Sequence, residues 1–241
     1  MAHRAEGFGG PANSRAAVAR AVEAGVPVIE IDLRGSKDGE LFVMHDGRLE
    51  RDTTLRGRVE SLTASEIERG RLKNGETIPR FEEVYEISRG RAVLSVDFKV
   101  SEDAMARTAD WVHAHGSFDD VIVFANTGEE MAVAAKAKQR YPEMLVMVRL
   151  LDTRVTVEST RAVFGGRLPE ILHTDRIGAE AVAGLHDLGA KVYMNALPVE
   201  RYFEPFRYFA IRSLLRTRVD FVLVSDPAPM MRRVSAERRA S

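Results

Sequence analysis

The chain has 241 residues, of which 45% are hydrophobic and 29% charged, and its formal net charge is −1. These values are typical of a globular protein with a full core, and the near-neutral charge argues against a general nucleic-acid or membrane-binding surface. The sequence has no cysteine, which excludes disulfides and thiolate metal sites. No apolar run approaches the length of a membrane span.

The chain opens on a charged motif, because His3 and Arg4 follow almost directly after Met1. This start does not have the pattern of a secretory signal. As it stands, the chain is therefore expected to be cytoplasmic. A secreted or periplasmic location is expected instead if an upstream signal has been removed. If His3 ends a strand, that strand is very short or has lost the residues that preceded it.

Residues 13–24 predict the first helix. Asn13 or Ser14 can cap its N-terminus, apolar residues recur along one side, and Gly25 stops it.

The next segment, 26–33, predicts a strand that carries two carboxylates, Glu30 and Asp32. Residues two apart in a strand point to the same side. These carboxylates are therefore expected to project from one face and to share one cation.

A short predicted strand over residues 41–44 ends at the pair His45-Asp46. The stretch that follows, 47–79, is polar and irregular. Within it, Thr63–Glu66 has the pattern of a capping box and predicts a short helix.

After this stretch, strand and helix patterns alternate regularly. The further predicted strands cover residues 92–97, 121–125, 145–150, 170–173, 191–195 and 221–224. The helices between and before them cover residues 81–88, 102–115, 128–141, 155–164, 179–188 and 206–215. With the strands before Arg4 and at Val28, this makes eight β-then-α units. The pattern predicts one α/β domain over residues 1–241, a (β/α)8 TIM barrel with a small insertion after strand 2, at about 47–79.

Candidate metal ligands fall at strand ends, where barrel enzymes carry their chemistry. Glu30, Asp32 and Asp97 offer hard oxygen atoms, a set that suits one divalent cation, Mg²⁺ or Ca²⁺, better than Zn²⁺. The alternative is a group of solvated surface carboxylates.

Candidate catalytic and substrate-binding residues occupy similar positions. His3 and His45 are the candidate acid and base, because imidazole titrates near neutral pH; the alternative is a structural role. Arg4 and Lys99 are candidate phosphate ligands, or partners of the same carboxylates. Two further strand-end residues are candidates for lining the mouth of the barrel, His173 and Asn195.

Residues 202–218 are aromatic and basic and are interpreted as an outer barrel helix. The alternative is an apolar wall for a lipid tail, formed by Phe203, Phe206 and Phe209.

Together these motifs resemble the glycerophosphodiester phosphodiesterases. That family has His-Arg near its start, Pro-Glu-Asn-Thr opening the first helix, then Glu-x-Asp, Asp-Gly, His-Asp, Glu-x-Lys and a late Thr-Asp-Pro. The counterparts here are His3-Arg4, Pro11-Ala12-Asn13-Ser14, Glu30-Ile31-Asp32, Asp38-Gly39, His45-Asp46, Asp97-Phe98-Lys99 and Ser225-Asp226-Pro227. The resemblance spans the chain and is strongest over its first hundred residues.

The resemblance implies a (β/α)8 barrel with an insertion after strand two, and a phosphoric diester hydrolase. Such an enzyme would use a divalent metal to convert glycerophosphodiesters into glycerol 3-phosphate and an alcohol. The metal would be held by Glu30, Asp32 and Asp97, with His3 and His45 as acid and base and Arg4 and Lys99 on the phosphate. The expected partner is a small phosphodiester or lysophospholipid, with no nucleic acid and no transmembrane segment.

The chain departs from the family pattern at three places. Ala12 replaces the Glu of the helix-opening motif, and Asp97 replaces the usual Glu. A similar Asp occurs in the related phospholipases D. Residues 192–195 replace the family's Trp-Thr-Val-Asn run, so the headgroup is left open. Two alternatives therefore stand beside hydrolysis: a lyase that releases a cyclic phosphate from a lysophospholipid, and a non-catalytic barrel that binds a phosphorylated ligand.

Overall fold

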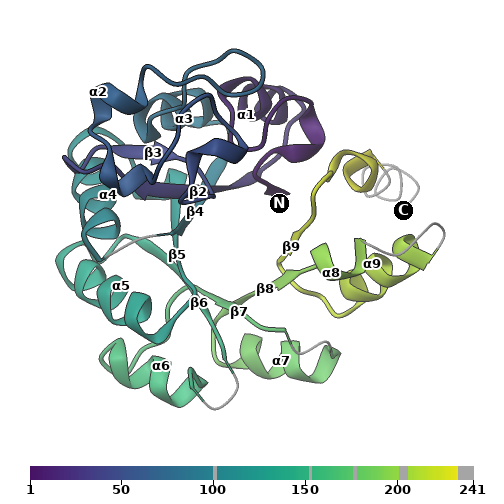
Figure 1. Cartoon of the computed structure of the whole chain (residues 1–241). Coiled ribbons are helices and arrows are strands. Elements are labelled where there is room, and N and C mark those ends of the chain that lie inside the picture. Colours follow the sequence, from purple (N-terminus) through teal and green to yellow (C-terminus); the bar gives the residue numbers. More distant parts are fainter. Residues whose placement is uncertain (100–101, 152–153, 176–177, 201–205, 233–241) are drawn as a thin grey trace. The chain divides into compact units, whose positions relative to one another are not determined.

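A computed structural model describes residues 1–99, 102–151, 154–175, 178–200 and 206–232 (Figure 1). The chain divides into two compact units. The first is Met1–Leu94 with the described part of Ser225–Ser241, and the second is Ser95–Val224.

The first unit is built on strand β2, Val28–Gly35. Strand β1, Ala2–His3, runs parallel to β2 and places His3 opposite Glu30. Strand β3, Leu41–Val43, runs antiparallel to the last residues of β2, Leu33 to Gly35. A strand that ends at His3, as the sequence predicts, is therefore present, and it pairs with β2 at Glu30.

Two helices of this unit lie side by side: α1, Arg15–Glu23, and α3, Phe81–Ser88 (Figure 1). Helix α1 buries the apolar side that the sequence predicts, and its N-cap is Ser14, whose side chain accepts a hydrogen bond from the amide of Ala17. A 3₁₀-helix, η1, Glu6–Phe8, precedes α1.

The insertion after β2 has a small core of its own. It contains β3, the 3₁₀-helices η2, Leu49–Arg51, and η3, Val59–Ser61, and helix α2, Ala64–Ile67. The predicted capping box is present, with Thr63 and Glu66 each bonding to the backbone of the other. The buried cluster consists of Phe42, Met44, Leu49, Val59, Ala64, Ile67, Leu72 and Ile78. The irregular sequence of the insertion is therefore held by apolar residues that show no regular period.

The second unit alternates strands and helices. Its strands are the end of β4, Val93–Phe98, then β5, Val121–Ala125, β6, Leu145–Arg149, β7, Ile171–His173, β8, Lys191–Asn195, and β9, Phe221–Leu223. Its helices are α4, Glu102–His115, η4, Phe118–Asp120, α5, Gly128–Arg140, α6, Val157–Val163, α7, Ala179–Asp187, α8, Leu197–Glu200, and α9, Phe206–Arg216. From β5 to β9 each strand pairs in parallel with the next. Strand β5 is buried along its whole length, as expected for a parallel strand covered on both faces.

The sheet order confirms the predicted fold class. In the described part of the chain the strands follow the order β1-β2-β4-β5-β6-β7-β8-β9, and β3 pairs with β2 off this path. This is the order of a (β/α)8 barrel with an insertion after strand two. Among the described helices, none is long and apolar enough to cross a membrane.

The N-terminal loop contacts the segment that follows β9, and both belong to the first unit. The amide of Gly7 donates to the carbonyl of Ser225 over 3.1 Å. A Cβ at Gly7 would lie 2.6 Å from Cβ of Asp226 and 2.8 Å from the carbonyl oxygen of Ser225. Only glycine allows this close approach between the two backbones.

We predict that Gly7→Ala destabilises the protein by about 1–3 kcal/mol, the usual cost of forcing extra atoms into a packed site. Urea denaturation measures the change. Gly35→Ala is the matched control, because a Cβ there meets nothing within 4 Å. Equal stability of the two variants would contradict the close approach.

Candidate active site

Strand β2 carries two buried carboxylates. Glu30 is 4% exposed and Asp32 is fully buried, at 0%. Their two-residue spacing places them on the same side of the strand, as the sequence predicts. Buried carboxylates are costly unless they are paired with cations or hydrogen-bond donors, so their partners define the site.

Asp32 is held by residues from the N-terminal loop. Nε of Arg4 lies 2.9 Å from its Oδ2, and Nδ2 of Asn13 donates to the same oxygen over 2.8 Å. Asn13 has a left-handed backbone, with φ of 63°, and its backbone N–H donates a hydrogen bond to the carbonyl of Arg4. The sequence predicts either Asn13 or Ser14 as the N-cap of helix α1. Ser14 is the cap, and Asn13 bonds to Asp32 instead.

Glu30 faces the same loop. Its Oε2 accepts a hydrogen bond from the backbone amide of Arg4 over 3.2 Å, and Nε2 of His3 lies 4.0 Å from that oxygen. Arg4 therefore serves both carboxylates, Glu30 through its amide and Asp32 through its guanidinium. Arg4 makes this double contact from a left-handed backbone, with φ of 48°.

Both candidate catalytic histidines have a carboxylate beside Nδ1. Nδ1 of His3 lies 3.0 Å from Oε1 of Glu6, and Nδ1 of His45 lies 2.6 Å from Oδ1 of Asp46. The hydrogen bond from His3 lowers the pKa of Glu6, and the bond from His45 lowers that of Asp46. In each ring the carboxylate lies beside Nδ1, and Nε2 is the nitrogen on the far side of the ring from it.

Sequence reasoning missed Glu6, whose side chain is 37% exposed. A carboxylate three residues after a candidate catalytic histidine was the available signal.

Arg34 of β2 holds the backbone of His45, and Glu60 of the insertion pairs with Arg34. Nε of Arg34 donates to the carbonyl of His45 over 2.8 Å, and Nη1 of Arg34 pairs with Glu60 at 2.6 Å. A cavity of about 460 Å³ lies in this unit. Its lining includes Arg4, Glu6 and His45.

In the second unit, Asp97 lies near the end of β4, beside Lys99 and Asn126. Nζ of Lys99 lies 2.5 Å from its Oδ2, and Nδ2 of Asn126 donates to its Oδ1 over 2.8 Å. These residues line a cavity of about 730 Å³ together with Glu130 and Arg149. Burial raises the pKa of Glu130, and the charge of Asp97 acts in the same direction.

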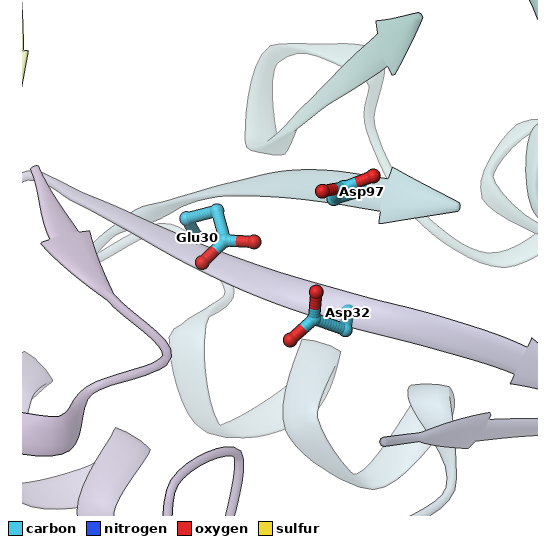
Figure 2. Close-up of side chains that lie close together, drawn as sticks. All are labelled: Glu30, Asp32 and Asp97. Atoms are coloured by element: carbon cyan, nitrogen blue, oxygen red, sulfur yellow. The ribbon is translucent and has the colours of Figure 1, made fainter. Parts of the chain in front are cut away.

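The three predicted metal ligands form a cluster. One carboxylate oxygen from each of Glu30, Asp32 and Asp97 lies within 4.8 Å of the other two (Figure 2). Three hard carboxylates without sulfur or imidazole suit Mg²⁺ or Ca²⁺. The donor set therefore fits a divalent cation, which would also offset the repulsion among the three negative charges.

The sequence of the chain matches the model of the glycerophosphoryl diester phosphodiesterase family over residues 3–190. The chain belongs to this family. A curated relative, the glycerophosphodiester phosphodiesterase of Caldanaerobacter subterraneus, is 38% identical over 94 residues, or 36% of this chain and 39% of that protein. The chain spans less than half the length of the first curated relatives it matches.

Solved structures show the same fold. A glycerophosphoryl diester phosphodiesterase from Parabacteroides distasonis matches with a TM-score of 0.79 and 24% identity, covering 98% of this chain and 85% of that one. An Oleispira antarctica phosphodiesterase, solved with the product sn-glycerol-3-phosphate, matches with a TM-score of 0.79 and 19% identity, covering 97% and 95%. These likenesses confirm the (β/α)8 fold of the family.

The two candidate mouth residues have internal partners. His173 is 3% exposed, and its ring packs edge-on against Tyr193, with centroids 4.6 Å apart, and beside Phe124. Oδ1 of Asn195 accepts a hydrogen bond from the amide of Leu197. Their contact with substrate stays a prediction. Phe203 of the alternative apolar wall lies outside the described residues, as do the side chains of Phe206 and Phe209.

His173 makes the stability of the protein depend on pH. Burial lowers its pKa to about 4, from 6.5 in the unfolded chain. Between these values the unfolded chain binds a proton that the folded protein does not, so stability falls as the pH falls through this window.

We predict that His173→Phe, which keeps a ring between Phe124 and Tyr193, removes this dependence. The loss of unfolding free energy from pH 7 to pH 4.5 should be smaller in the variant by about 2 kcal/mol. Urea denaturation at both pH values measures it. Parallel losses in the two proteins would show that His173 is protonated within the folded state.

Proposed function

We propose that this protein hydrolyses glycerol-type phosphodiesters to glycerol 3-phosphate and an alcohol, with the help of one divalent cation. The observation that carries the proposal is the cluster of Glu30, Asp32 and Asp97 in a chain of the glycerophosphoryl diester phosphodiesterase family. Curated relatives bear the name glycerophosphodiester phosphodiesterase, and the Oleispira structure holds sn-glycerol-3-phosphate. Both support a small glycerol phosphodiester as the substrate.

The two basic residues would bind the phosphate. Arg4 and Lys99 each lie beside a carboxylate of the cluster, at 2.9 Å from Asp32 and 2.5 Å from Asp97. A guanidinium and an ammonium can both donate to phosphate oxygens. A divalent cation held by Glu30, Asp32 and Asp97 would stabilise charge on the phosphate oxygens and lower the pKa of a bound hydroxyl.

The two histidines would move the protons. Nε2 of one takes the proton of the substrate's neighbouring glycerol hydroxyl, whose oxygen attacks phosphorus. Nε2 of the other gives a proton to the alcohol oxygen as its bond to phosphorus breaks. Water then opens the cyclic phosphate to the monoester, with the histidine roles reversed. The carboxylates of Glu6 and Asp46 beside the Nδ1 atoms would stabilise each imidazolium as it forms.

A second candidate is a reaction that stops at the cyclic phosphate, with a lysophospholipid as substrate. Asp97 favours it, because the phospholipases D that resemble this family carry an Asp at the corresponding position. The two candidates differ in whether water opens the ring.

One experiment separates them. Glycerophosphocholine, glycerophosphoethanolamine and lysophosphatidylcholine are incubated with the protein, with and without EDTA, and products are followed by ³¹P NMR. Monoester from the small diesters supports hydrolysis, and cyclic phosphate alone supports the second candidate. No turnover of any substrate would leave a barrel that only binds a phosphorylated ligand.

We predict that Asp32→Asn abolishes both activity and divalent-cation binding, because it removes one negative ligand and keeps the side-chain volume. Calorimetric titration with Mg²⁺ and Ca²⁺ measures the binding, and circular dichroism checks the fold. Asp119→Asn, at an exposed position, is the charge-matched control and should change neither. Full turnover by EDTA-stripped protein would refute the metal role.

We predict that replacing either His3 or His45 by Ala lowers kcat by about 10²–10⁴-fold, the usual contribution of a positioned proton-transfer group. Steady-state kinetics on the best small diester measures this. His115→Ala is the control, because that ring stacks on Trp111 at the surface. Losses below tenfold at both His3 and His45 would exclude the assigned roles.

A further inference from the structure

Asn126 stands where β5 gives way to α5, and its backbone is held by the cap of that helix. Thr127 is the N-cap, and its side chain accepts from the amide of Glu130 over 3.2 Å. The carboxylate of Glu130 accepts in turn from the amide of Asn126 over 2.6 Å. The main chain at Asn126 is therefore fixed by Thr127 and Glu130, without any use of the Asn126 side chain.

That side chain reaches Asp97 instead. Nδ2 of Asn126 donates to Oδ1 of Asp97 over 2.8 Å. This hydrogen bond links the residue directly after β5 to strand β4. An ionised carboxylate only accepts hydrogen bonds, so the amide must present its nitrogen. Lys99 occupies the other oxygen, Oδ2, at 2.5 Å. Each oxygen of Asp97 thus has a defined donor.

We propose that Asn126 is a positioning residue for the metal ligand Asp97. Asp97 replaces the Glu that is usual in the family, so its carboxylate sits one methylene closer to the strand and depends on a narrow range of side-chain torsions. A hydrogen bond from a rigid helix cap fixes the plane of that carboxylate before a cation arrives. Partners of this kind orient metal ligands, and their loss typically weakens metal binding by about 10–100-fold.

The inference rests on the metal role within the proposed function, but not on the reaction itself. Asn126 contributes no ligand atom and no proton to the chemistry. Removing the Asn126 side chain should therefore change cation affinity. The helix cap should survive in Asn126→Ala, because the backbone amide that donates a hydrogen bond to Glu130 is still present.

The test is calorimetric titration of the full chain with Mg²⁺ and Ca²⁺, together with thermal unfolding in EDTA. Asn126→Ala should weaken cation binding by about 10–100-fold and leave the unfolding temperature in EDTA close to that of the unmodified protein. Asn126→Ser, whose side chain is too short for the same contact, should behave alike and serves if the Ala variant does not fold.

Thr156→Ala is the matched control. It removes the side-chain cap of another helix of the same unit, α6, so it should lower the unfolding temperature in EDTA while cation affinity stays within threefold. Unchanged affinity in both Asn126 variants would overturn the inference, and so would an affinity loss that only follows the loss of stability. An unmodified protein that binds no cation would overturn it together with the metal role. Cation binding that depends on Asn126 in a protein without turnover would support the inference while the proposed reaction failed.

Discussion

The buried negative charge on β2 is the constraint around which the first unit is arranged. Asp32 is fully buried and Glu30 nearly so, and an unpaired carboxylate in such a place would be strongly unfavourable. The loop after β1 has three residues with left-handed backbones, Arg4, Ala5 and Asn13. Two of them, Arg4 and Asn13, contact the carboxylates. Each non-glycine residue in that conformation costs on the order of 1 kcal/mol. The strain persists because it directs the amide and guanidinium of Arg4, and the amide group of Asn13, onto the two carboxylates.

The second unit meets the same electrostatic problem at Asp97 with a different device. There the partners come directly after strands: Lys99 follows β4, and Asn126 follows β5, with its backbone held by the cap of α5. A helix N-terminus also favours nearby negative charge, so the start of α5 is a natural place for a donor to a carboxylate. Strain in one unit and capping in the other lead to the same result, a carboxylate held in one orientation.

The sequence predicts most of the fold because the barrel repeats a strong local signal. Strands β5 and β8 and helices α3 and α4 begin and end where the patterns place them, since apolar runs and caps mark their bounds. The clustering of Glu30, Asp32 and Asp97 is also predicted, because parallel strand ends meet at one edge. The partners of these residues are not. Asn13 has the sequence signature of a helix cap. In the structure its backbone has a positive φ, and its side chain donates a hydrogen bond to Asp32, which the sequence pattern does not predict.

The residues of the candidate site differ in how far away in sequence their partners lie, and this should affect which substitutions each position accepts. Each histidine takes its carboxylate from the nearby chain, Glu6 three residues after His3 and Asp46 directly after His45. Such pairs form wherever the local backbone is correct. The proposed metal ligands take donors both from nearby and from far away in sequence: Lys99 is two residues from Asp97, whereas Asn13 is 19 residues from Asp32 and Asn126 is 29 from Asp97. If the distant donor Asn126 orients Asp97, variation between Asp and Glu at this position in the family should follow the residue directly after β5. Each histidine should instead vary with its own neighbours in the chain.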